Sequence, residues 1–84
     1  MFKVYVLYSP GSNKLYVGFT ASLRNRLISH NLLGVKDWTR SYRPWLLIHV
    51  EIFETKKEAL AREKILKSGK GREFIRKEIL PIFL

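Results

Sequence analysis

The stretch FKVYVLYSPGSNKLYVGFT, residues 2–20, decides the fold of this chain. Residues 2–9 are β-branched and aromatic on both alternating faces, which predicts a strand that is covered on both sides. The sequence PGSN at residues 10–13 is a turn signal, and KLYVGFT at residues 14–20 predicts a second strand. Together the two strands are expected to form an antiparallel hairpin.

Helix and strand signals alternate along the next part of the chain. Ser22 stands where it can cap a helix that runs to about Leu33 and stops at Gly34. The mixture of charges, aromatic residues and proline at residues 35–44 predicts a connecting segment. The apolar run WLLIHVEIF, residues 45–53, then predicts a third strand.

Two more helices are predicted after the third strand. The sequence TKKE at residues 55–58 is a capping box, and it opens a helix that extends to about Lys67 with Gly69 as its C-cap. Residues 72–80 predict a last short helix that Pro81 stops. The element order predicts an α/β (α+β) fold, in which a small three-stranded, mainly antiparallel sheet is flanked by three helices.

Length and composition restrict the kind of protein. A chain of 84 residues supports one domain, residues 1–84, around one core. Sixteen Lys and Arg against seven Asp and Glu give a net charge of +9, which favours a nucleic-acid partner. Plain solubility and an acidic protein partner are the alternatives. The absence of cysteine excludes disulfides and Cys-based zinc sites.

The sequence predicts neither a membrane protein nor a secreted one. Its longest apolar run falls far short of the roughly 20 residues that span a bilayer. The N-terminal residues have the pattern of a strand and not of a signal peptide. A cytoplasmic location is therefore expected.

Two tyrosines on the predicted hairpin are the first candidates for a functional site. Pairing Ser9 with Lys14 places Tyr5 opposite Gly18 and diagonal to Tyr16 on the same face, a spacing that aromatic side chains can bridge. A glycine inside a strand indicates a bulge or the close approach of another group. Two core tyrosines beside a bulge are the structural alternative.

Three polar residues fall where helices normally place core residues. At about 100° per residue, Arg26 and His30 lie among the leucines of the first helix, and Glu63 lies in the apolar stripe of the second. An inward Arg26 requires a protein carboxylate or a substrate phosphate. An inward Glu63 requires Arg26 or a hard metal ion such as Mg²⁺. His30 taken alone is more often a hydrogen-bonded core residue.

Two basic segments are candidates for contact with nucleic acid. Residues 38–43 alternate aromatic and basic side chains, which suits base stacking and phosphate contact, or a loop that packs its aromatic groups inward. Residues 67–72 are rich in glycine and lysine but lack the spacing of a P-loop, so we interpret them as a helix end with available charges. The residues predicted to bind nucleic acid are Arg40, Arg43, Lys67, Lys70 and Arg72.

These residues together resemble the GIY-YIG endonuclease domain, which occurs in phage homing endonucleases and in the incision subunit (excinuclease) of bacterial nucleotide excision repair. The segments YVGFT, RPW and KSGKGREF are similar to the small, stand-alone bacterial members of this family. The resemblance covers nearly the whole chain. The matching positions are Lys3-Val4-Tyr5, Tyr16-Val17-Gly18, Arg26, His30 and Glu63.

The resemblance implies a metal-dependent endonuclease that hydrolyses phosphodiester bonds in DNA, in repair or recombination. It implies that Tyr5 and Tyr16 line the site and that one of them activates or orients the attacking water. Arg26 would stabilise charge on the phosphate, and His30 would lie near the nucleophile or leaving group. Glu63 would hold one divalent ion, Mg²⁺ or Mn²⁺. Such roles suit chemistry in which positioning and electrostatic stabilisation supply most of the rate.

The sequence also departs from the family pattern. Lys3 and Val4 replace the glycine and isoleucine of the first triplet, Phe19 stands where some repair relatives have lysine, and no asparagine follows Asn31. These departures bear on the details of water activation and not on the family resemblance. Two other functions are open from the sequence. One is a non-catalytic nucleic-acid-binding module on the same fold. The other is a subunit that is active only with a protein partner that supplies target recognition.

Overall fold

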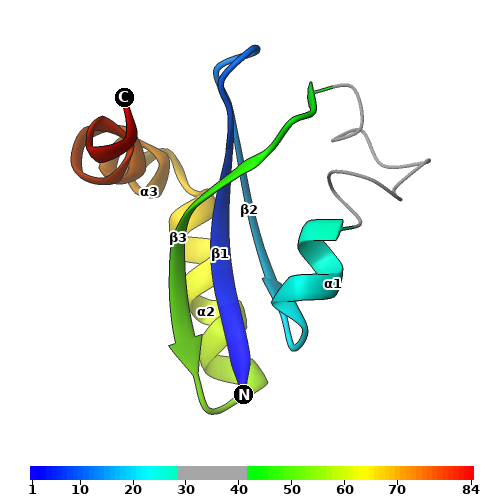
Figure 1. Cartoon of the computed structure of the whole chain (residues 1–84). Helices are drawn as coiled ribbons and strands as arrows, with labels where there is room; N and C mark the ends of the chain where they lie inside the picture. The colour runs from blue at the N-terminus through cyan, green and yellow to red at the C-terminus, as the bar shows by residue number, and fades with distance from the viewer. Residues whose placement is uncertain (29–41) are drawn as a thin grey trace.

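The computed structural model describes residues 1–28 and 42–84, and within them an antiparallel sheet forms the centre of the molecule (Figure 1). The sheet consists of β1 (Phe2–Ser9), β2 (Lys14–Thr20) and β3 (Leu46–Phe53), in the order β2-β1-β3. The predicted α+β fold is confirmed, since strands and helices follow in the order β-β-α-β-α-α over the described residues.

The hairpin pairs in the register that its sequence predicts. Ser9 lies opposite Lys14 and Tyr5 lies opposite Gly18, with no interruption between β1 and β2. The pairing of β1 with β3 is also antiparallel, but its register shifts between Val6 and Leu7. Because β1 is paired on both edges, β2 is an outer strand of the sheet within the described residues.

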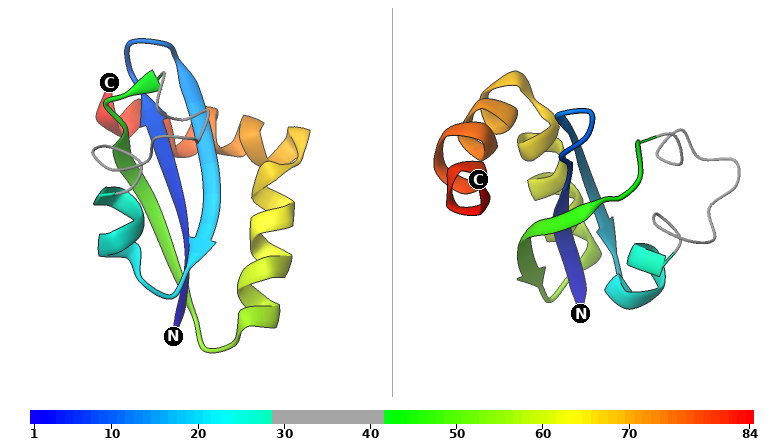
Figure 2. Two further views of the ribbon diagram at one scale, coloured as in Figure 1. Left: turned by 90° about the vertical axis from the view of Figure 1, so that its right-hand side faces the viewer. Right: turned by 45° about the horizontal axis from the view of Figure 1, so that its top comes forward.

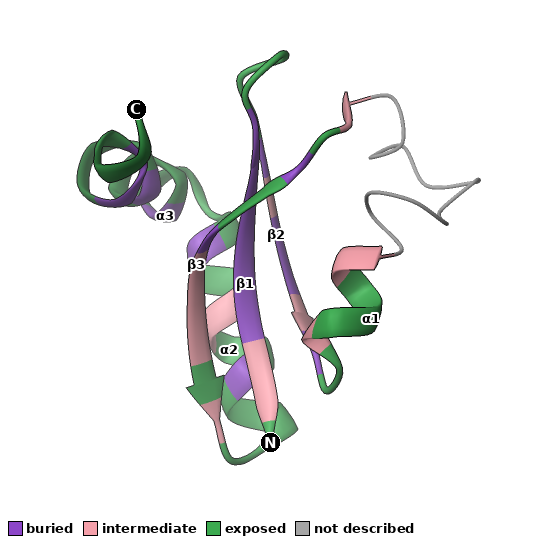
Figure 3. Ribbon diagram, viewed as in Figure 1, coloured by how far each residue is buried: buried purple, intermediate pink, exposed green. Residues whose placement is uncertain are grey.

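Helices cover both faces of the sheet (Figure 2). On one face, Val4 and Val6 of β1 pack against Ala59 and Leu66 of helix α2 (Lys56–Lys67). The opposite face holds a second cluster around Tyr5, Leu7 and Trp45, against which α1 (Leu23–Ile28) places its leucines. The central strand is therefore buried along most of its length (Figure 3), as its two apolar faces predict.

The capping box of α2 is confirmed. The Thr55 side chain accepts a hydrogen bond of 3.2 Å from the backbone N–H of Glu58, and the Glu58 carboxylate accepts one of 3.3 Å from the backbone N–H of Thr55. The prediction of Gly69 as C-cap is wrong. Ser68 ends α2 and also caps the next helix, where its hydroxyl accepts a hydrogen bond from Gly71 N–H at 3.1 Å.

The last helical segment is longer than predicted. Helix α3 (Gly69–Phe74) begins before residue 72 and continues through a π-helical turn η3 (Ile75–Ile79) into a 3₁₀ turn η4 (Leu80–Phe83). Pro81 does not stop this segment, because it lies in the first turn of η4, where a helix needs no donor from that residue.

Two other boundaries were predicted from the sequence. The third strand begins at Leu46, one residue later than predicted. The predicted end of the first helix, at Leu33 and Gly34, lies outside the described residues. In residues 1–28 and 42–84, no helix has the length and apolar character needed to span a membrane.

Candidate active site

The closest packing in the hairpin is that of Tyr5 against Gly18. Tyr5 is 1% exposed, and its ring crosses the backbone of β2 at the glycine. A Cβ atom at Gly18 would lie 2.6 Å from the hydroxyl oxygen and 2.8 Å from Cζ of Tyr5, closer than atoms approach without displacement. Gly18 therefore admits the tyrosine side chain, and the alternative of a bulge at this position is wrong because the β1–β2 register is continuous there.

Tyr16 lies beside Tyr5, as the diagonal placement predicts. The two ring centroids are 6.1 Å apart with an interplanar angle of 29°. Trp45 supports the pair from the other side, with its ring at 6.2 Å from Tyr16 in an edge-on arrangement. The half-buried Tyr16 thus joins the buried Tyr5 to the surface of the molecule.

Three of the other predicted residues, Tyr16, Arg26 and Glu63, act on the pKa of the Tyr5 hydroxyl. Burial and the neighbouring Tyr16 raise the pKa of the Tyr5 hydroxyl well above its ordinary value, and Glu63 acts in the same direction. The positive charge of Arg26 acts against this rise in the Tyr5 pKa. Tyr5 is therefore a neutral phenol at physiological pH, and its hydroxyl keeps a proton with which to donate a hydrogen bond.

Arg26 lies on α1, and its position differs from the expected one. The leucines Leu23 and Leu27 of this helix are half-buried against the Tyr5 cluster, whereas Arg26 is exposed. In the described residues it forms no ion pair with a carboxylate, so the structural alternative of a buried partner is not supported there. Arg26 is exposed because α1 packs through its leucines and leaves the arginine accessible to solvent and to an anionic ligand.

Glu63 projects from α2 and is mostly buried, with 16% of its side chain exposed. Its ion-pair partner is Lys67, one helical turn away, at 3.5 Å, and not Arg26. An i,i+4 pair in which the lysine is half exposed holds its geometry weakly. The carboxylate can therefore exchange this lysine for another cation at little cost.

A second carboxylate fixes the rotation of α2. Arg62, the residue next to Glu63, donates from Nε to Glu51 Oε1 at 2.8 Å and from Nη2 to Oε2 at 3.0 Å. His49 Nε2 lies 2.7 Å from the same Oε2 atom. This bidentate contact joins β3 to one side of the helix, while the neighbouring Glu63 pairs with Lys67.

Glu51 remains charged in this arrangement. Burial would raise its pKa, but hydrogen bonds from Arg62 and His49 outweigh burial and hold the pKa below its ordinary value. Sequence analysis did not single out His49, Glu51 or Arg62. The alternation of His49 and Glu51 on one face of a strand could have indicated a shared partner, but not which helix residue supplies it.

The described residues suit one hard metal ion held by few protein ligands. They contain no cluster of three or more acidic or histidine side chains. Glu63 offers a carboxylate that is largely shielded from solvent, and the hydroxyl groups of the tyrosine pair lie nearby. Mg²⁺ accepts such a site because it keeps several waters and takes further oxygen ligands from a substrate phosphate.

The remaining predicted residues are distributed differently. His30 and Arg40 lie outside the described residues, and Arg43 is half-buried before β3. Lys67 and Arg72 line one cavity together with Tyr16. Lys70 instead lines a separate, smaller and mainly apolar pocket with Phe74.

Replacement of Gly18 by alanine tests the role of the tyrosine packing. The new methyl group must displace the Tyr5 ring, because the buried side chain has no space to withdraw into. We expect a loss of about 1–3 kcal/mol of stability from overpacking, together with a loss of any activity that depends on the Tyr5 hydroxyl. Gly11→Ala is the matched control, since no atom lies within 4 Å of a Cβ at that position. Wild-type melting and activity in Gly18→Ala would contradict this role.

Comparison with known proteins adds independent information. The family profile described as the GIY-YIG catalytic domain matches residues 1–77. A UPF0213 protein of Bacillus velezensis is 47% identical over 51 residues, which cover 61% of this chain and 52% of that protein. UPF0213 proteins of Staphylococcus haemolyticus and Streptococcus pyogenes are each 36% identical, over 67% and 69% of this chain and 68% and 63% of their own lengths. The matches thus span about half to two thirds of these relatives.

Proposed function

This chain belongs to the GIY-YIG family of nuclease catalytic domains, and from that membership we propose that it is a divalent-metal-dependent endonuclease acting on DNA. The observation that supports the proposal best is the convergence of four side chains from four elements. Tyr5 of β1 lies against Tyr16 of β2, and the charges of Arg26 and Glu63, on α1 and α2, both act on its hydroxyl. A cation, a carboxylate and neutral hydroxyl groups are the components that phosphodiester hydrolysis requires.

Each of these residues has a role that follows from its position. Arg26 is exposed, so its planar guanidinium can donate hydrogen bonds to two phosphate oxygens of a strand that approaches from solvent. Tyr5 is buried and protonated, so it is suited to orient the attacking water or the phosphate by hydrogen bonding. Tyr16 is half-buried beside Tyr5, and it can complete the hydrogen bonding around the reacting group.

Glu63 is the residue that would hold the metal. When bound, a divalent ion supplies Lewis-acid stabilisation of charge on the phosphate and lowers the pKa of a coordinated water. Mg²⁺ and Mn²⁺ both suit the oxygen ligands offered here. The pair with Lys67, at 3.5 Å and with the lysine half exposed, does not commit Glu63 to a rigid protein partner.

The proposal includes the substrate and the cellular location. The net charge of +9 and the family's nuclease activity support DNA as the substrate, in repair or recombination, within the cytoplasm. A protein partner could supply target recognition, as in the alternative of a subunit that is active only with such a partner.

Nicking of supercoiled plasmid by the purified chain tests the proposal. We expect conversion to nicked and linear DNA with Mg²⁺ or Mn²⁺ and no conversion in EDTA, because Glu63 alone does not stabilise the charge on the reacting phosphate. The metal series is run at equal ionic strength, since binding to a polyanion weakens with salt. Plasmid binding without cleavage by either ion would favour the non-catalytic module. Cleavage that appears only after addition of cell extract would favour a partner-dependent subunit.

A further inference from the structure

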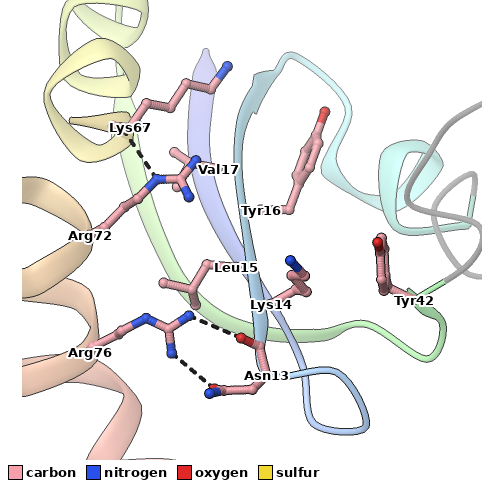
Figure 4. Close-up of a pocket in the computed structure, with 9 residues that line it drawn as sticks. All are labelled: Asn13, Lys14, Leu15, Tyr16, Val17, Tyr42, Lys67, Arg72 and Arg76. Atoms are coloured by element: carbon pink, nitrogen blue, oxygen red, sulfur yellow. Dashed lines mark hydrogen bonds between the residues drawn. The ribbon is translucent and has the colours of Figure 1, made fainter. Parts of the chain in front are cut away.

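A basic cavity of about 730 Å³ runs along the outer edge of β2, between that strand and the C-terminal helical segment (Figure 4). Among residues 1–28 and 42–84, its wall contains four cationic side chains, two tyrosines and no carboxylate. The lining residues are Asn13, Lys14, Leu15, Tyr16, Val17, Tyr42, Lys67, Arg72 and Arg76. Sequence analysis had singled out only some of them.

The cavity adjoins the candidate active site through two shared residues. Tyr16 lines the cavity and also packs against Tyr5 at 6.1 Å between ring centroids. Lys67 lines it as well, and its Nζ atom lies 3.5 Å from Glu63 Oε2. The cavity and the candidate site therefore share Tyr16 and Lys67 as their common boundary.

One wall of the cavity is rigidly built. Arg76 of η3 donates to Asn13 Oδ1 at 2.9 Å and to the Asn13 carbonyl oxygen at 3.0 Å. Asn13 adopts a positive φ of 53°, which asparagine tolerates better than most residues and which belongs to the turn between β1 and β2. Tyr8 donates a further hydrogen bond of 3.1 Å to the same Oδ1 atom. The wall is therefore in place before any ligand binds.

Arg72 is the cation best placed to meet a ligand. Its Nε donates to the Lys67 carbonyl oxygen at 3.3 Å, which holds the guanidinium over the cavity and toward β2 (Figure 4). Within residues 1–28 and 42–84 its terminal nitrogens have no other hydrogen bond or ion pair. On the far side, Lys14 lies over the Tyr42 ring at 5.7 Å from the centroid.

We propose that this cavity binds the phosphodiester that flanks the scissile phosphate in the same nucleic-acid strand. Arg72 and Lys67 contact the phosphate oxygens, while Tyr16 and Tyr42 flank the attached sugar or base. The inference rests on the proposed function, because it places the scissile phosphate at Tyr5, Arg26 and Glu63. It adds Lys14, Tyr42 and Arg76 to the nucleic-acid surface and removes Lys70 from it, since Lys70 lines the other pocket.

The geometry favours a phosphodiester over an acidic peptide. A single phosphate group carries several oxygens, so it can accept hydrogen bonds from the Arg72 guanidinium and the adjoining Lys67 together. The tyrosine walls offer ring faces that stack on a base or pack against a sugar. The carboxylates of an acidic peptide would pair with the cationic side chains, but they would not stack on the tyrosine rings.

Equilibrium binding in EDTA tests the proposal separately from cleavage. The probe is a fluorescently labelled double-stranded oligonucleotide, and binding to the whole chain is followed by anisotropy over a series of salt concentrations. Arg72→Gln is expected to weaken binding roughly tenfold and to reduce the log–log salt slope by about one, because one phosphate contact is lost. Arg72→Lys should restore most of the slope but not all of the affinity.

The matched control is Lys57→Gln, which removes the same charge from an exposed position of α2 outside the cavity. It should change the affinity by less than about twofold, through the overall field alone. Lys14→Gln tests the opposite wall, and its exposed strand position makes misfolding a poor explanation for weaker binding. We expect it to reduce the salt slope as Arg72→Gln does.

Two results would overturn the cavity proposal. One is an equal loss of affinity in Arg72→Gln and Lys57→Gln, which would mean that only net charge matters. The other is competition by polyglutamate that matches competition by an unlabelled oligonucleotide at the same charge concentration. Neither result bears on whether plasmid is cleaved, and an absence of cleavage would leave the anisotropy results unchanged. Failure of the cavity proposal can therefore be distinguished from failure of the proposed function.

Discussion

Glu63→Gln is expected to reduce metal-dependent cleavage to the level of a sample without protein while nucleic-acid binding persists. Glutamine keeps the size of the side chain but removes the charge that would hold a divalent ion. Binding should persist because phosphate contacts come from cationic residues elsewhere, and it should strengthen slightly because Lys67 is released from its pair. Plasmid nicking and anisotropy in EDTA measure the two effects.

The matched control for Glu63 is Glu73→Gln on α3. Glu73 also pairs with a lysine one helical turn away, Lys77, at 2.6 Å, but both side chains are mainly exposed. Neither variant should change the melting temperature much, because exposed or weak i,i+4 pairs contribute only about 0.3–0.5 kcal/mol. Wild-type nicking by Glu63→Gln at saturating Mg²⁺ would eliminate the metal-binding role of Glu63.

Arg26→Ala should lower turnover by roughly 10²–10³-fold, the scale of losing one preorganised charge or donor in a transition state. Arg26→Lys should recover part of this loss, since an ammonium keeps the charge but lacks the planar fork. Arg24→Ala is the control, because it removes the same charge from an exposed position of the same helix. Initial rates of plasmid nicking give the comparison.

Thermal melts separate catalysis from structure at Arg26. The side chain is exposed and has no ion pair in the described part of the chain, so its removal should leave the melting temperature nearly unchanged. A loss of several kcal/mol, the scale of breaking a buried ion pair, would show instead that Arg26 has a structural partner. Unchanged turnover in Arg26→Ala would exclude the transition-state role.

Local sequence rules predicted the parts of the molecule that depend on neighbours in the chain. The hairpin register follows from a short turn and strict side-chain alternation, and it brought Tyr5 and Tyr16 together as predicted. The capping box at 55–58 was equally predictable because both partners lie within one helical turn. Helical spacing also placed Glu63 correctly on a largely buried side of α2. Their catalytic roles stay predictions.

Features that depend on distant residues were not predictable. Gly69 has the composition of a C-cap, but Ser68 takes that role because a new helix starts at once and needs its hydroxyl. Helical periodicity predicted that Arg26 points inward, yet α1 packs through Leu23 and Leu27 and leaves Arg26 exposed. The contact of Arg62 with Glu51 joins residues that are 11 positions apart on different elements. The sequence pattern of α2 or of β3 does not predict which residue of the other element is the partner.

The clamp between Arg76 and Asn13 joins residues that are 63 positions apart. During translation the hairpin can pair as soon as its own residues emerge, since its contacts are local. At that stage the tyrosine pair exists, but its carboxylate and the cationic wall of the cavity have not been synthesised. The residues proposed to hold the metal and the flanking phosphate therefore join the tyrosine pair only after the helical segments have been synthesised. A nascent chain that ends after the hairpin would hold one part of the proposed cleavage site and would lack the rest.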